Sequence, residues 1–271
     1  MSYQLSCSIV LYNTAEEVLK AAVDSVLQSD MKVKLFLIDN SPVERYNETF
    51  GRLPDVTYIF NNANVGYGAA HNIGIRKSIE EGIPYHLVLN PDVEFGPQVL
   101  STLFRFMDVR PGVGLVMPQI RFPDGSLQYL CKMMPTPFDL IVRRFIPAAL
   151  QKPLQARMDR YEFRHKDYNK VMDVPNLSGC FMFMRTAALK EVGGFDEGYF
   201  MYLEDVDLVR RIGEKYSTMY NPEVFVCHAY AKESYKGTKL MRYHIRSAFY
   251  YFNKWGWFFD GRRRRINRLC R

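Results

Sequence analysis

The fold of this chain is decided by residues 5–42, which read LSCSIVLYNTAEEVLKAAVDSVLQSDMKVKLFLIDNSP. Residues 5–11 are an apolar segment of strand length, and from Thr14 onward apolar side chains recur at helical spacing. Residues 33–38 form a second apolar segment, which ends in the turn cluster of residues 39–42. A strand, a helix and a strand in this order predict parallel strands joined by a crossover helix, and therefore an α/β fold.

The same alternation continues along the chain. With 271 residues, of which 48% are hydrophobic, the chain suits one α/β domain, alone or with a small appendage. Residues 130–174 are less regular and contain several prolines among basic and aromatic residues. Further strands are predicted at residues 56–60, 85–89, 115–117 and 180–184, and a helix is predicted at about residues 69–81.

Polar side chains follow three of the predicted strands at the point where each strand ends. In a doubly wound sheet, ligands bind outside the carboxyl ends of the strands, so these side chains are expected on one ligand-binding edge. They are Tyr12 and Asn13 after the first strand, Asp39 and Asn40 after the second, and Asn90 and Asp92 after the fourth.

Charge and cysteine content narrow the class of protein. The net charge is +7, but six arginines lie in the last ten residues, and the rest of the chain is nearly neutral. The five cysteines are scattered without metal-type spacing, which fits unpaired thiols in a reducing cytosol. We find no signal-peptide pattern and no apolar run long enough for a membrane span, so we expect a protein that is neither exported nor integral to a membrane.

A second informative stretch reads GGFDEGYFMYLEDVDLVRR at residues 193–211. Three carboxylates, Glu204, Asp205 and Asp207, fall in the first turn of a predicted helix, where the helix dipole favours negative charge. The aromatic side chains around them would raise the pKa of one carboxylate, as a general base working near neutral pH requires. The alternative is an acidic first turn on an ordinary amphipathic helix.

This stretch closely resembles the C-terminal signature of the inverting family 2 glycosyltransferases, with the best match to the bacterial branch that includes rhamnosyltransferases. Four other segments are similar to the same family, so the resemblance covers about residues 3–232. It implies a GT-A fold, with a mixed, mostly parallel sheet flanked by helices. It also implies a donor half at about residues 1–115 and an acceptor half at about residues 116–232.

The resemblance assigns the polar strand ends to the nucleotide sugar. As an exposed carboxylate, Asp39 would accept the imide N–H of a uracil or thymine ring, although the same side chain could simply cap its turn. Residues 64–75, NVGYGAAHNIGI, resemble the family's Asn- and Gly-rich motif, in which small residues let backbone N–H groups approach a diphosphate. The donor-binding residues implied are Leu11, Tyr12, Asn13, Asp39, Asn40, Asn64, Gly66, Asn72, Asn90 and Asp92.

Asn90-Pro91-Asp92 stands where most such transferases carry a DxD metal motif. The resemblance implies that Asp92 binds Mg²⁺ or Mn²⁺ bridging the donor phosphates, and that His228 completes the metal site. Asn90 in place of the first carboxylate puts tight metal binding in doubt. The alternatives are a plain turn at residues 90–92 and a structural histidine at 228.

Alignment with the family makes Asp205 the catalytic base that deprotonates an acceptor hydroxyl, with Glu204 orienting the acceptor or tuning Asp205. Asp207 is expected to cap the helix or to pair with Arg210 or Arg211. The function implied is transfer of L-rhamnose from dTDP-L-rhamnose to a polyprenyl-linked or other surface-glycan acceptor. The alternatives are a UDP-sugar transferase (galactose, glucose or N-acetylhexosamine), a nucleotidyltransferase on a related fold, and a non-enzymatic membrane or nucleic-acid adaptor.

Residues 233–271 lie beyond the resemblance and are predicted to form an amphipathic, basic helical tail. Aromatic side chains crowd residues 243–257 and arginines follow from Arg262. This composition favours a helix on the anionic inner face of the cell membrane, where each basic residue contributes about 1 kcal/mol. The alternatives are a disordered end, an RNA-binding arm, or packing of the rings on the body or on a second subunit in a homodimer. We expect a cytoplasmic, peripheral membrane protein that binds no nucleic acid.

Overall fold

The computed structural model describes residues 3–140, 152–229 and 238–270. Three predicted strands have the predicted bounds, and the sheet gains longer and additional strands in the second half of the chain. The strands are β1 (Leu5–Leu11), β2 (Val33–Asp39), β3 (Val56–Phe60), β4 (Tyr85–Leu89), β5 (Val93–Phe95), β6 (Val113–Arg121), β7 (Met172–Asp173), β8 (Phe181–Arg185) and β9 (Ser217–His228).

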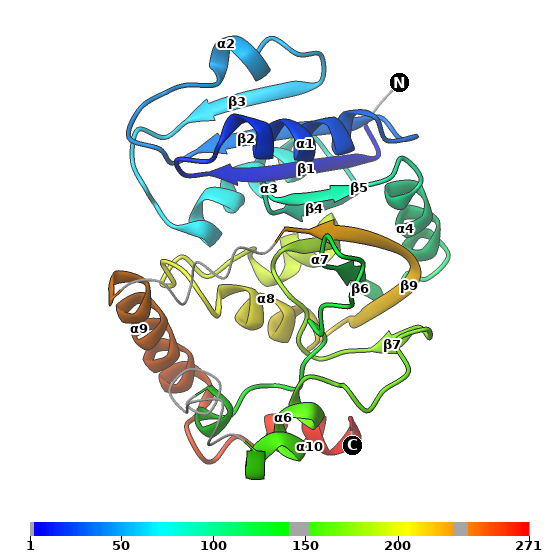
Figure 1. The fold of residues 1–271 in the computed structure, drawn as a ribbon, viewed down its shortest axis with the longest axis vertical. Coiled ribbons are helices and arrows are strands. Elements are labelled where there is room, and N and C mark those ends of the chain that lie inside the picture. The colour runs from blue at the N-terminus through cyan, green and yellow to red at the C-terminus, as the bar shows by residue number, and fades with distance from the viewer. Residues whose placement is uncertain (1–2, 141–151, 230–237, 271) are drawn as a thin grey trace.

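Helices flank this sheet on both faces (Figure 1). The first helix begins at Glu16 rather than at Thr14, and the helix predicted from residue 69 begins at Tyr67. The helices are α1 (Glu16–Leu27), α2 (Asn47–Phe50), α3 (Tyr67–Glu80), α4 (Val99–Asp108), α6 (Gln155–Tyr161), α7 (Thr186–Val192), α8 (Glu204–Ile212), α9 (Thr238–Trp255) and α10 (Gly261–Leu269).

The sheet is mixed, and its strand order is β3-β2-β1-β4-β8-β6-β9-β5, with β7 paired to β9. The four strands of the N-terminal part are parallel to one another, as the alternation of strands and helices predicts. Strand β8 then enters antiparallel between β4 and β6, while β6 and β9 pair in parallel. The GT-A arrangement of a mixed sheet flanked by helices is therefore confirmed.

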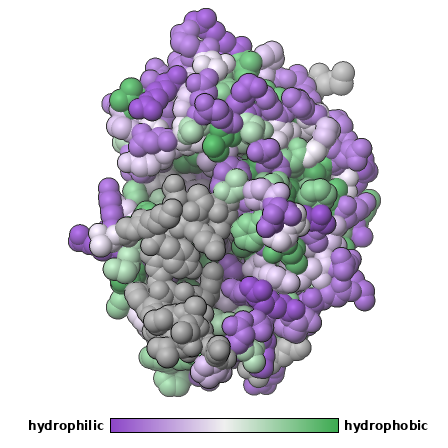
Figure 2. Space-filling model, in the orientation of Figure 1, coloured by the Kyte–Doolittle hydropathy of each residue, from purple (hydrophilic) through white to green (hydrophobic). Residues whose placement is uncertain are grey.

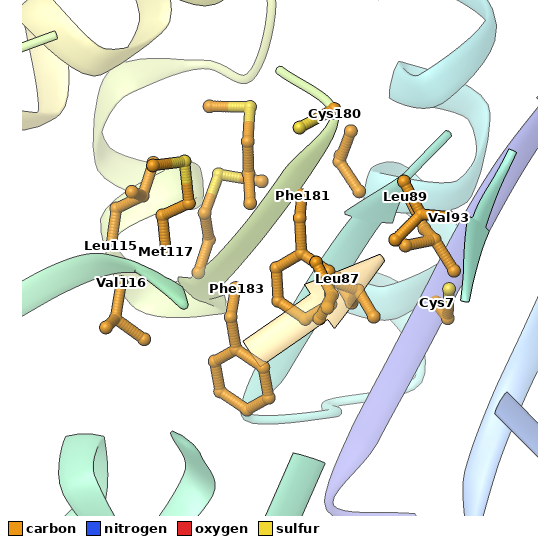
Figure 3. Close-up of a cluster of buried hydrophobic side chains, with 14 of the residues drawn as sticks. Cys7, Leu87, Leu89, Val93, Leu115, Val116, Met117, Cys180, Phe181 and Phe183 are labelled. Atoms are coloured by element: carbon orange, nitrogen blue, oxygen red, sulfur yellow. The ribbon is translucent and has the colours of Figure 1, made fainter. Parts of the chain in front are cut away.

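The centre of the core lies where β4 meets β8. Leu87 is opposite Phe183 and Leu89 is opposite Phe181, and all four side chains are fully buried (Figure 3). Strands covered by helices on both faces read as continuous apolar runs, which is why these segments show no alternation of polar and apolar residues. This central pair of strands fixes the position of the loop that precedes β8.

A buried polar network joins α3 to the sheet. His71 Nδ1 lies 2.7 Å from Ser8 Oγ, and Ser8 Oγ lies 2.8 Å from His86 Nε2. The other nitrogen of His86 lies 2.8 Å from both Ser6 Oγ and Ser78 Oγ. Burial lowers the pKa of His71 well below its usual range and that of His86 to about 3, so both rings are neutral. The network therefore anchors α3 without carrying charge.

The C-terminal helices pack on the body of the molecule, below α8 in Figure 1. Tyr251 and Phe252 of α9 are buried in a cluster with Tyr199, Leu203 and Val206. The predicted boundary between residues 232 and 233 lies outside the described residues. Among the described helices, none combines the length and the apolar character that crossing a membrane requires.

Candidate active site

The carboxyl ends of β1, β2 and β3 lie side by side, and β4 pairs in parallel with β1 on its other side, so the three predicted strand ends, those of β1, β2 and β4, share one edge of the sheet. Leu11 is in register with Asp39, and Asp39 is in register with Phe60. Backbone hydrogen bonds of 2.9 Å continue the alignment beyond the strands, from Asn40 N to Leu11 O and from Asn61 N to Asp39 O. Tyr12 is half exposed at this edge, which leaves its ring available to a ligand.

Asp39 is fully buried, so the expectation of an exposed carboxylate at this position is wrong. One oxygen accepts a 2.8 Å hydrogen bond from Ser41 N, and the other accepts a 2.5 Å bond from the Tyr58 hydroxyl. The first bond is the turn-capping arrangement that was the alternative for this residue. Contact between Asp39 and a nucleobase stays a prediction, and it requires Tyr58 or the turn to share the carboxylate.

A set of asparagine side chains holds the loop that leads into α3. Asn61 Nδ2 donates to Asn40 Oδ1 at 2.8 Å, and Asn40 Nδ2 donates to Gly66 O at 3.2 Å. Asn64 Oδ1 accepts from Gly66 N at 3.1 Å. These bonds bring the predicted residues Asn40, Asn64 and Gly66 together beside the strand ends.

The glycines at the start of α3 let another segment of the chain approach closely. Gly66 has a φ of +93°, and a Cβ there would lie 2.4 Å from Phe200 O. A Cβ on Gly68 would lie 2.9 Å from the Cβ of Phe195. The backbone N–H of Tyr67 donates to Phe200 O at 3.0 Å, so this N–H is not free for a phosphate. The two motifs quoted above are therefore one packed unit.

Asn72 belongs to that unit, which corrects the prediction that it contacts the donor. Its Nδ2 donates to Phe195 O at 2.9 Å, and its Oδ1 accepts from Phe195 N at 2.8 Å. The same Nδ2 also lies 2.9 Å from Glu197 Oε1. Because the buried amide is used by the loop around Phe195, Asn72 positions that loop.

Asp92 and His228 lie together, as a shared metal site requires. Asp92 Oδ1 is 3.4 Å from His228 Nε2, while His228 Nδ1 is 3.0 Å from Gln128 Oε1. Burial lowers the pKa of His228, but the neighbouring Cys180 and Asp92 offset this and raise it to about 10. Gln128 orients the ring so that Nε2 faces the carboxylate, as hydrogen-bond partners of metal-binding histidines do.

This pair fits a metal ion that is bound mainly by its substrate. Among the described residues, no group of three or more His, Cys, Asp or Glu side chains could hold an ion. Mg²⁺ is commonly held by one or two carboxylates together with substrate phosphates, and imidazole adds a ligand that Mn²⁺ accepts. One carboxylate and one imidazole therefore suit an ion that binds together with a diphosphate and displaces the Nε2 proton of His228.

Asn90 is linked to the acceptor half by Tyr67, a residue that the sequence analysis did not select. The Tyr67 hydroxyl is 3.0 Å from Asn90 Oδ1 and 2.8 Å from Gly179 O. Asn90 N also donates to Cys180 O at 2.9 Å. Tyr67 is the fourth residue of the quoted Asn- and Gly-rich motif, and its place directly between two glycines is the only sequence signal that could have identified it.

The adjacent carboxyl groups of Glu204 and Asp205 differ in their surroundings. Asp205 Oδ2 accepts from Gly179 N at 2.9 Å, and its Oδ1 accepts from Val206 N at 2.8 Å. Glu204 is 5% exposed, and its buried Oε2 has no hydrogen-bond partner among the described residues. Burial, followed by the charge of Asp205, raises the pKa of Glu204 well above its usual range.

Burial also raises the pKa of Asp205, while the two backbone N–H groups and the charge of Lys132 oppose that rise. Hydrogen bonds to an ionised carboxylate favour the charged form, and a carboxyl without donors stays protonated more readily. Asp205 is therefore the carboxylate of this pair that ionises first, which favours it over Glu204 as a base.

The third carboxylate of the stretch, Asp207, links α8 to neighbouring side chains. Asp207 is fully buried and pairs with Arg211 at 2.7 Å, which confirms one of the two predicted partners. Arg210 instead forms a buried pair with Asp260 of the tail, at 2.7 Å. Asp207 also accepts 2.7 Å from Trp255 Nε1, so the tail contacts α8 directly.

Backbone strain precedes the carboxyl pair. Tyr202 and Leu203 have φ values of 70° and 66°, a left-handed conformation that is uncommon for bulky residues. Two such residues in succession turn the chain sharply into α8. Strain of this kind persists where the surroundings fix it and is frequent at functional sites.

Comparison with known proteins identifies relatives over most of the chain. The model of the family described as Glycosyl transferase family 2 matches residues 6–193. N-acetylglucosaminyl-diphospho-decaprenol L-rhamnosyltransferase of Mycobacterium tuberculosis is 33% identical over 219 residues, which cover 74% of this chain and 68% of that protein. Rhamnosyltransferase WbbL of Escherichia coli is 24% identical over 250 residues, which cover 90% of each chain.

Solved structures share the fold at low sequence identity. GalNAc-T7 with UDP, GalNAc and Mn²⁺ superposes with a TM-score of 0.62 at 16% identity, over 84% of this chain and 44% of that one. The mannosyltransferase PcManGT of Pyrobaculum calidifontis, in complex with GDP-Man and Mn²⁺, gives 0.57 at 17% identity, over 92% and 61%. The chain thus spans less than two thirds of these two structures.

Proposed function

The chain belongs to glycosyl transferase family 2 and is a glycosyltransferase, and from this premise we propose that it transfers L-rhamnose from dTDP-L-rhamnose to a polyprenyl-linked glycan. The proposal for the sugar rests on the relatives that are named rhamnosyltransferases. Transfer of a sugar from a nucleotide sugar to an acceptor hydroxyl requires a site for the donor, a site for the leaving diphosphate and a base. The described residues supply candidates for all three.

One observation carries the chemical part of the proposal. The Asp205 carboxylate accepts a 2.9 Å hydrogen bond from Gly179 N. The next residue, Cys180, accepts a backbone hydrogen bond from Asn90 N. Asn90 in turn precedes Asp92 by two residues, so the base and the proposed leaving-group site share a single junction of loops.

The reaction proposed is a single displacement with inversion. Asp205 takes the proton of the acceptor hydroxyl as its oxygen forms a bond to the anomeric carbon. The bond from that carbon to the phosphate oxygen breaks, and the nucleoside diphosphate leaves with the electron pair. Protonated Glu204 can donate a hydrogen bond to the acceptor, and it adds no second charge beside the base.

The donor would lie across the strand ends. Leu11, Tyr12, Asn13, Asp39 and Asn40 would hold the nucleoside, and Asn64, Gly66 and Asn90 would line the path toward the diphosphate. Asp92 and His228 would hold Mg²⁺ or Mn²⁺, which would neutralise the charge that develops on the leaving diphosphate.

The test is release of nucleoside diphosphate from dTDP-L-rhamnose, UDP-sugars and GDP-sugars, with a synthetic N-acetylglucosaminyl-diphospho-polyprenol as acceptor and Mg²⁺ or Mn²⁺ present. We expect acceptor-dependent turnover with dTDP-L-rhamnose and its collapse in Asp205→Asn. Turnover with a UDP-sugar alone would keep the class of reaction and reject rhamnose as the sugar. Full activity of Asp205→Asn would reject Asp205 as the base.

We also propose that the C-terminal helices hold the protein at the inner, cytoplasmic surface of the cell membrane. Phe258 and Phe259 are 69% and 90% exposed, and Phe249 on α9 is 56% exposed. Exposed arginines accompany them on α10. Elsewhere the described surface visible in Figure 2 is mostly hydrophilic, with hydrophobic side chains in small groups.

Vesicle sedimentation tests this second proposal. Arg264→Gln, Arg265→Gln and Arg268→Gln together should weaken binding to anionic vesicles by more than tenfold, since each basic residue contributes about 1 kcal/mol near such a surface. Lys20→Gln on α1, with Arg45→Gln and Arg52→Gln on either side of α2, removes the same charge and should change binding little, because α1 and α2 lie far from α10 in Figure 1. Equal binding by the two triple variants would contradict the proposal. The homodimer stays a prediction.

A further inference from the structure

One phenol occupies the junction between the donor and acceptor halves. Tyr67 is the first residue of α3, and its hydroxyl is 2.8 Å from Gly179 O and 3.0 Å from Asn90 Oδ1. The chain separations are 112 and 23 residues, so this side chain joins segments that are remote in sequence. The position is fixed from behind, because Tyr67 N donates to Phe200 O and the ring packs on His71 with centroids 4.4 Å apart.

The phenol is held in its neutral form. Burial raises its pKa well above the usual value, and the charges of Glu204, Asp205 and Asp92 act in the same direction. A neutral phenol has one proton to donate, and the two oxygens that face it are both neutral acceptors. Asn90 is therefore suited to this place in a way that an aspartate is not, since a carboxylate there would add another negative charge near those of Asp92 and Asp205.

Gly179 is hydrogen-bonded both to Tyr67 and to Asp205, the proposed base. Its carbonyl oxygen accepts from Tyr67, while its N–H donates to Asp205 Oδ2 at 2.9 Å. A Cβ on Gly179 would lie 3.1 Å from the Cβ of Asp205, so the backbone and the carboxylate are in close contact. The next residue is held as well, because Cys180 O accepts from Asn90 N at 2.9 Å.

We propose that Tyr67 is a positioning residue for the transfer reaction. Its hydroxyl holds Gly179, and Gly179 holds the Asp205 carboxylate near Asn90, the residue that follows β4. Asn90 then acts as the neutral acceptor for Tyr67 and not as a metal ligand. This inference rests on the proposed role of Asp205 as the base.

Tyr67→Phe tests the inference because it removes only the hydroxyl. We expect kcat to fall about tenfold, the size that the loss of one buried hydrogen bond gives, while KM for the nucleotide sugar stays within about twofold. A looser Gly179 N–H stabilises the ionised carboxylate less, so the acidic limb of the kcat/KM profile should move to higher pH. Glu204, Lys132 and Tyr67 are the titratable groups that act on Asp205, and only Tyr67 is changed.

Tyr220→Phe is the matched control. Its buried hydroxyl, on β9, donates to a backbone carbonyl, Tyr168 O, at 2.9 Å and accepts from Gln119 Nε2 at 3.1 Å. A general loss of packing would affect both variants, but only Tyr67→Phe should move the acidic limb. An unchanged kcat and an unmoved limb in Tyr67→Phe would overturn the inference.

A double-mutant cycle with Asn90→Ala separates the two roles of Asn90. If Asn90 acts through Tyr67, the double variant should be no worse than Tyr67→Phe alone. Additive losses in the double variant would show that Asn90 acts independently of Tyr67 and would overturn that part of the inference.

A direct titration of Asp205 does not depend on the identity of the donor. Carboxyl-¹³C NMR, with the signal assigned by its loss in Asp205→Asn, should show a higher pKa for Asp205 in Tyr67→Phe than in the wild type. Absence of turnover by the wild type with every donor would count against the proposed function, while an equal pKa in the two proteins would count against the role of Tyr67.

Discussion

At the scale of single residues, the two adjacent carboxyls that begin α8 are distinguished by their hydrogen bonds. Asp205 receives two backbone N–H donors, whereas the buried Oε2 of Glu204 receives none from the described residues. The pair can therefore share one proton, with Glu204 as its holder. A base with a raised pKa next to a neutral acid requires no further titrating partner to work near neutral pH.

This difference predicts that Asp205→Asn and Glu204→Gln affect activity to very different extents. Asp205→Asn should lower kcat by about 10²- to 10⁴-fold, the range typical for loss of a general base. Glu204→Gln should retain most of the activity, because the glutamine replaces a carboxyl that is already neutral.

The pH profile checks the same point. Activity requires ionised Asp205, so kcat/KM should fall as pH drops through its raised pKa. Glu204→Gln removes the negative charge that Glu204 carries when it ionises, so the acidic limb should stay in place or move to lower pH. A limb that moves to higher pH in Glu204→Gln would contradict the assignment.

Asn72 gives a second prediction at this scale. Asn72→Ala should lower the free energy of unfolding by about 1–3 kcal/mol, since it leaves the buried backbone groups of Phe195 without partners. Chemical denaturation measures this loss, and isothermal titration measures nucleotide affinity in the same protein. Weakened nucleotide binding at unchanged stability would restore the reading of Asn72 as a donor ligand.

At the scale of elements, α8 is held by the tail as well as by the sheet. Arg210 makes two hydrogen bonds to Asp260, at 2.7 and 3.0 Å, and its guanidinium lies 4.1 Å from the centroid of the Trp255 ring. Both partners of the ion pair are almost fully buried. The helix that carries the proposed base therefore depends on residues 45 to 50 positions further along the chain.

Asp260→Ala should cost about 3–5 kcal/mol in the free energy of unfolding, because it leaves a buried guanidinium without its counter-ion. Lys20→Ala breaks an exposed pair with Asp24 and should have little effect. Denaturant titration compares the two variants, and similar losses for both would contradict this account.

The pH dependence of that loss has a definite sign. Burial would raise the pKa of Asp260, but hydrogen bonds from Arg210 and from Arg263 N more than offset it, and the pKa lies below its usual range. A depressed carboxyl pKa stabilises the fold above the unfolded-state pKa, and this contribution is lost as pH falls through the folded-state value. The difference between wild type and Asp260→Ala should therefore shrink below about pH 4.

The sequence predicted the elements better than their partners. The strand bounds at residues 5–11, 56–60 and 85–89 follow from local apolar runs between turn residues, and the structure confirms them. The contact between Asn72 and Phe195 spans 123 residues, and that between Tyr67 and Gly179 spans 112. Local sequence patterns do not predict contacts between residues so far apart in the chain. For this reason the sequence analysis did not identify the link made by Tyr67, and it assigned Asn72 to the donor and not to the loop around Phe195.

At the scale of the whole molecule, the tail is part of the packed body and not a detached anchor. Tyr251 and Phe252 are buried against α8 and the segment before it, while Phe258 and Phe259 remain exposed. Composition alone could not separate these two groups, because aromatic residues that pack and aromatic residues that face a surface look alike in a sequence. The tail therefore combines a structural part with the part proposed to bind membranes.

Truncation tests this division. A chain that ends at residue 237 should be aggregation-prone or strongly destabilised, because it exposes Tyr199, Leu203 and Val206 and leaves Arg210 unpaired. Removal of the exposed Phe258 and Phe259 side chains, as Phe258→Ser and Phe259→Ser, should leave the melting temperature nearly unchanged. Native-like stability of the truncated chain, measured by calorimetry, would contradict this account and show that the chain folds without α9 and α10.

The measurement that tests the central claim most directly is the anomeric configuration of the transferred sugar, determined by NMR on product made by the wild type from a donor of known configuration. A single displacement with Asp205 as the base predicts inversion, with product formed about 10²- to 10⁴-fold more slowly by Asp205→Asn. A product with retained configuration would require two displacements or a different attack on the donor. That result would contradict the mechanism and the role given to Asp205.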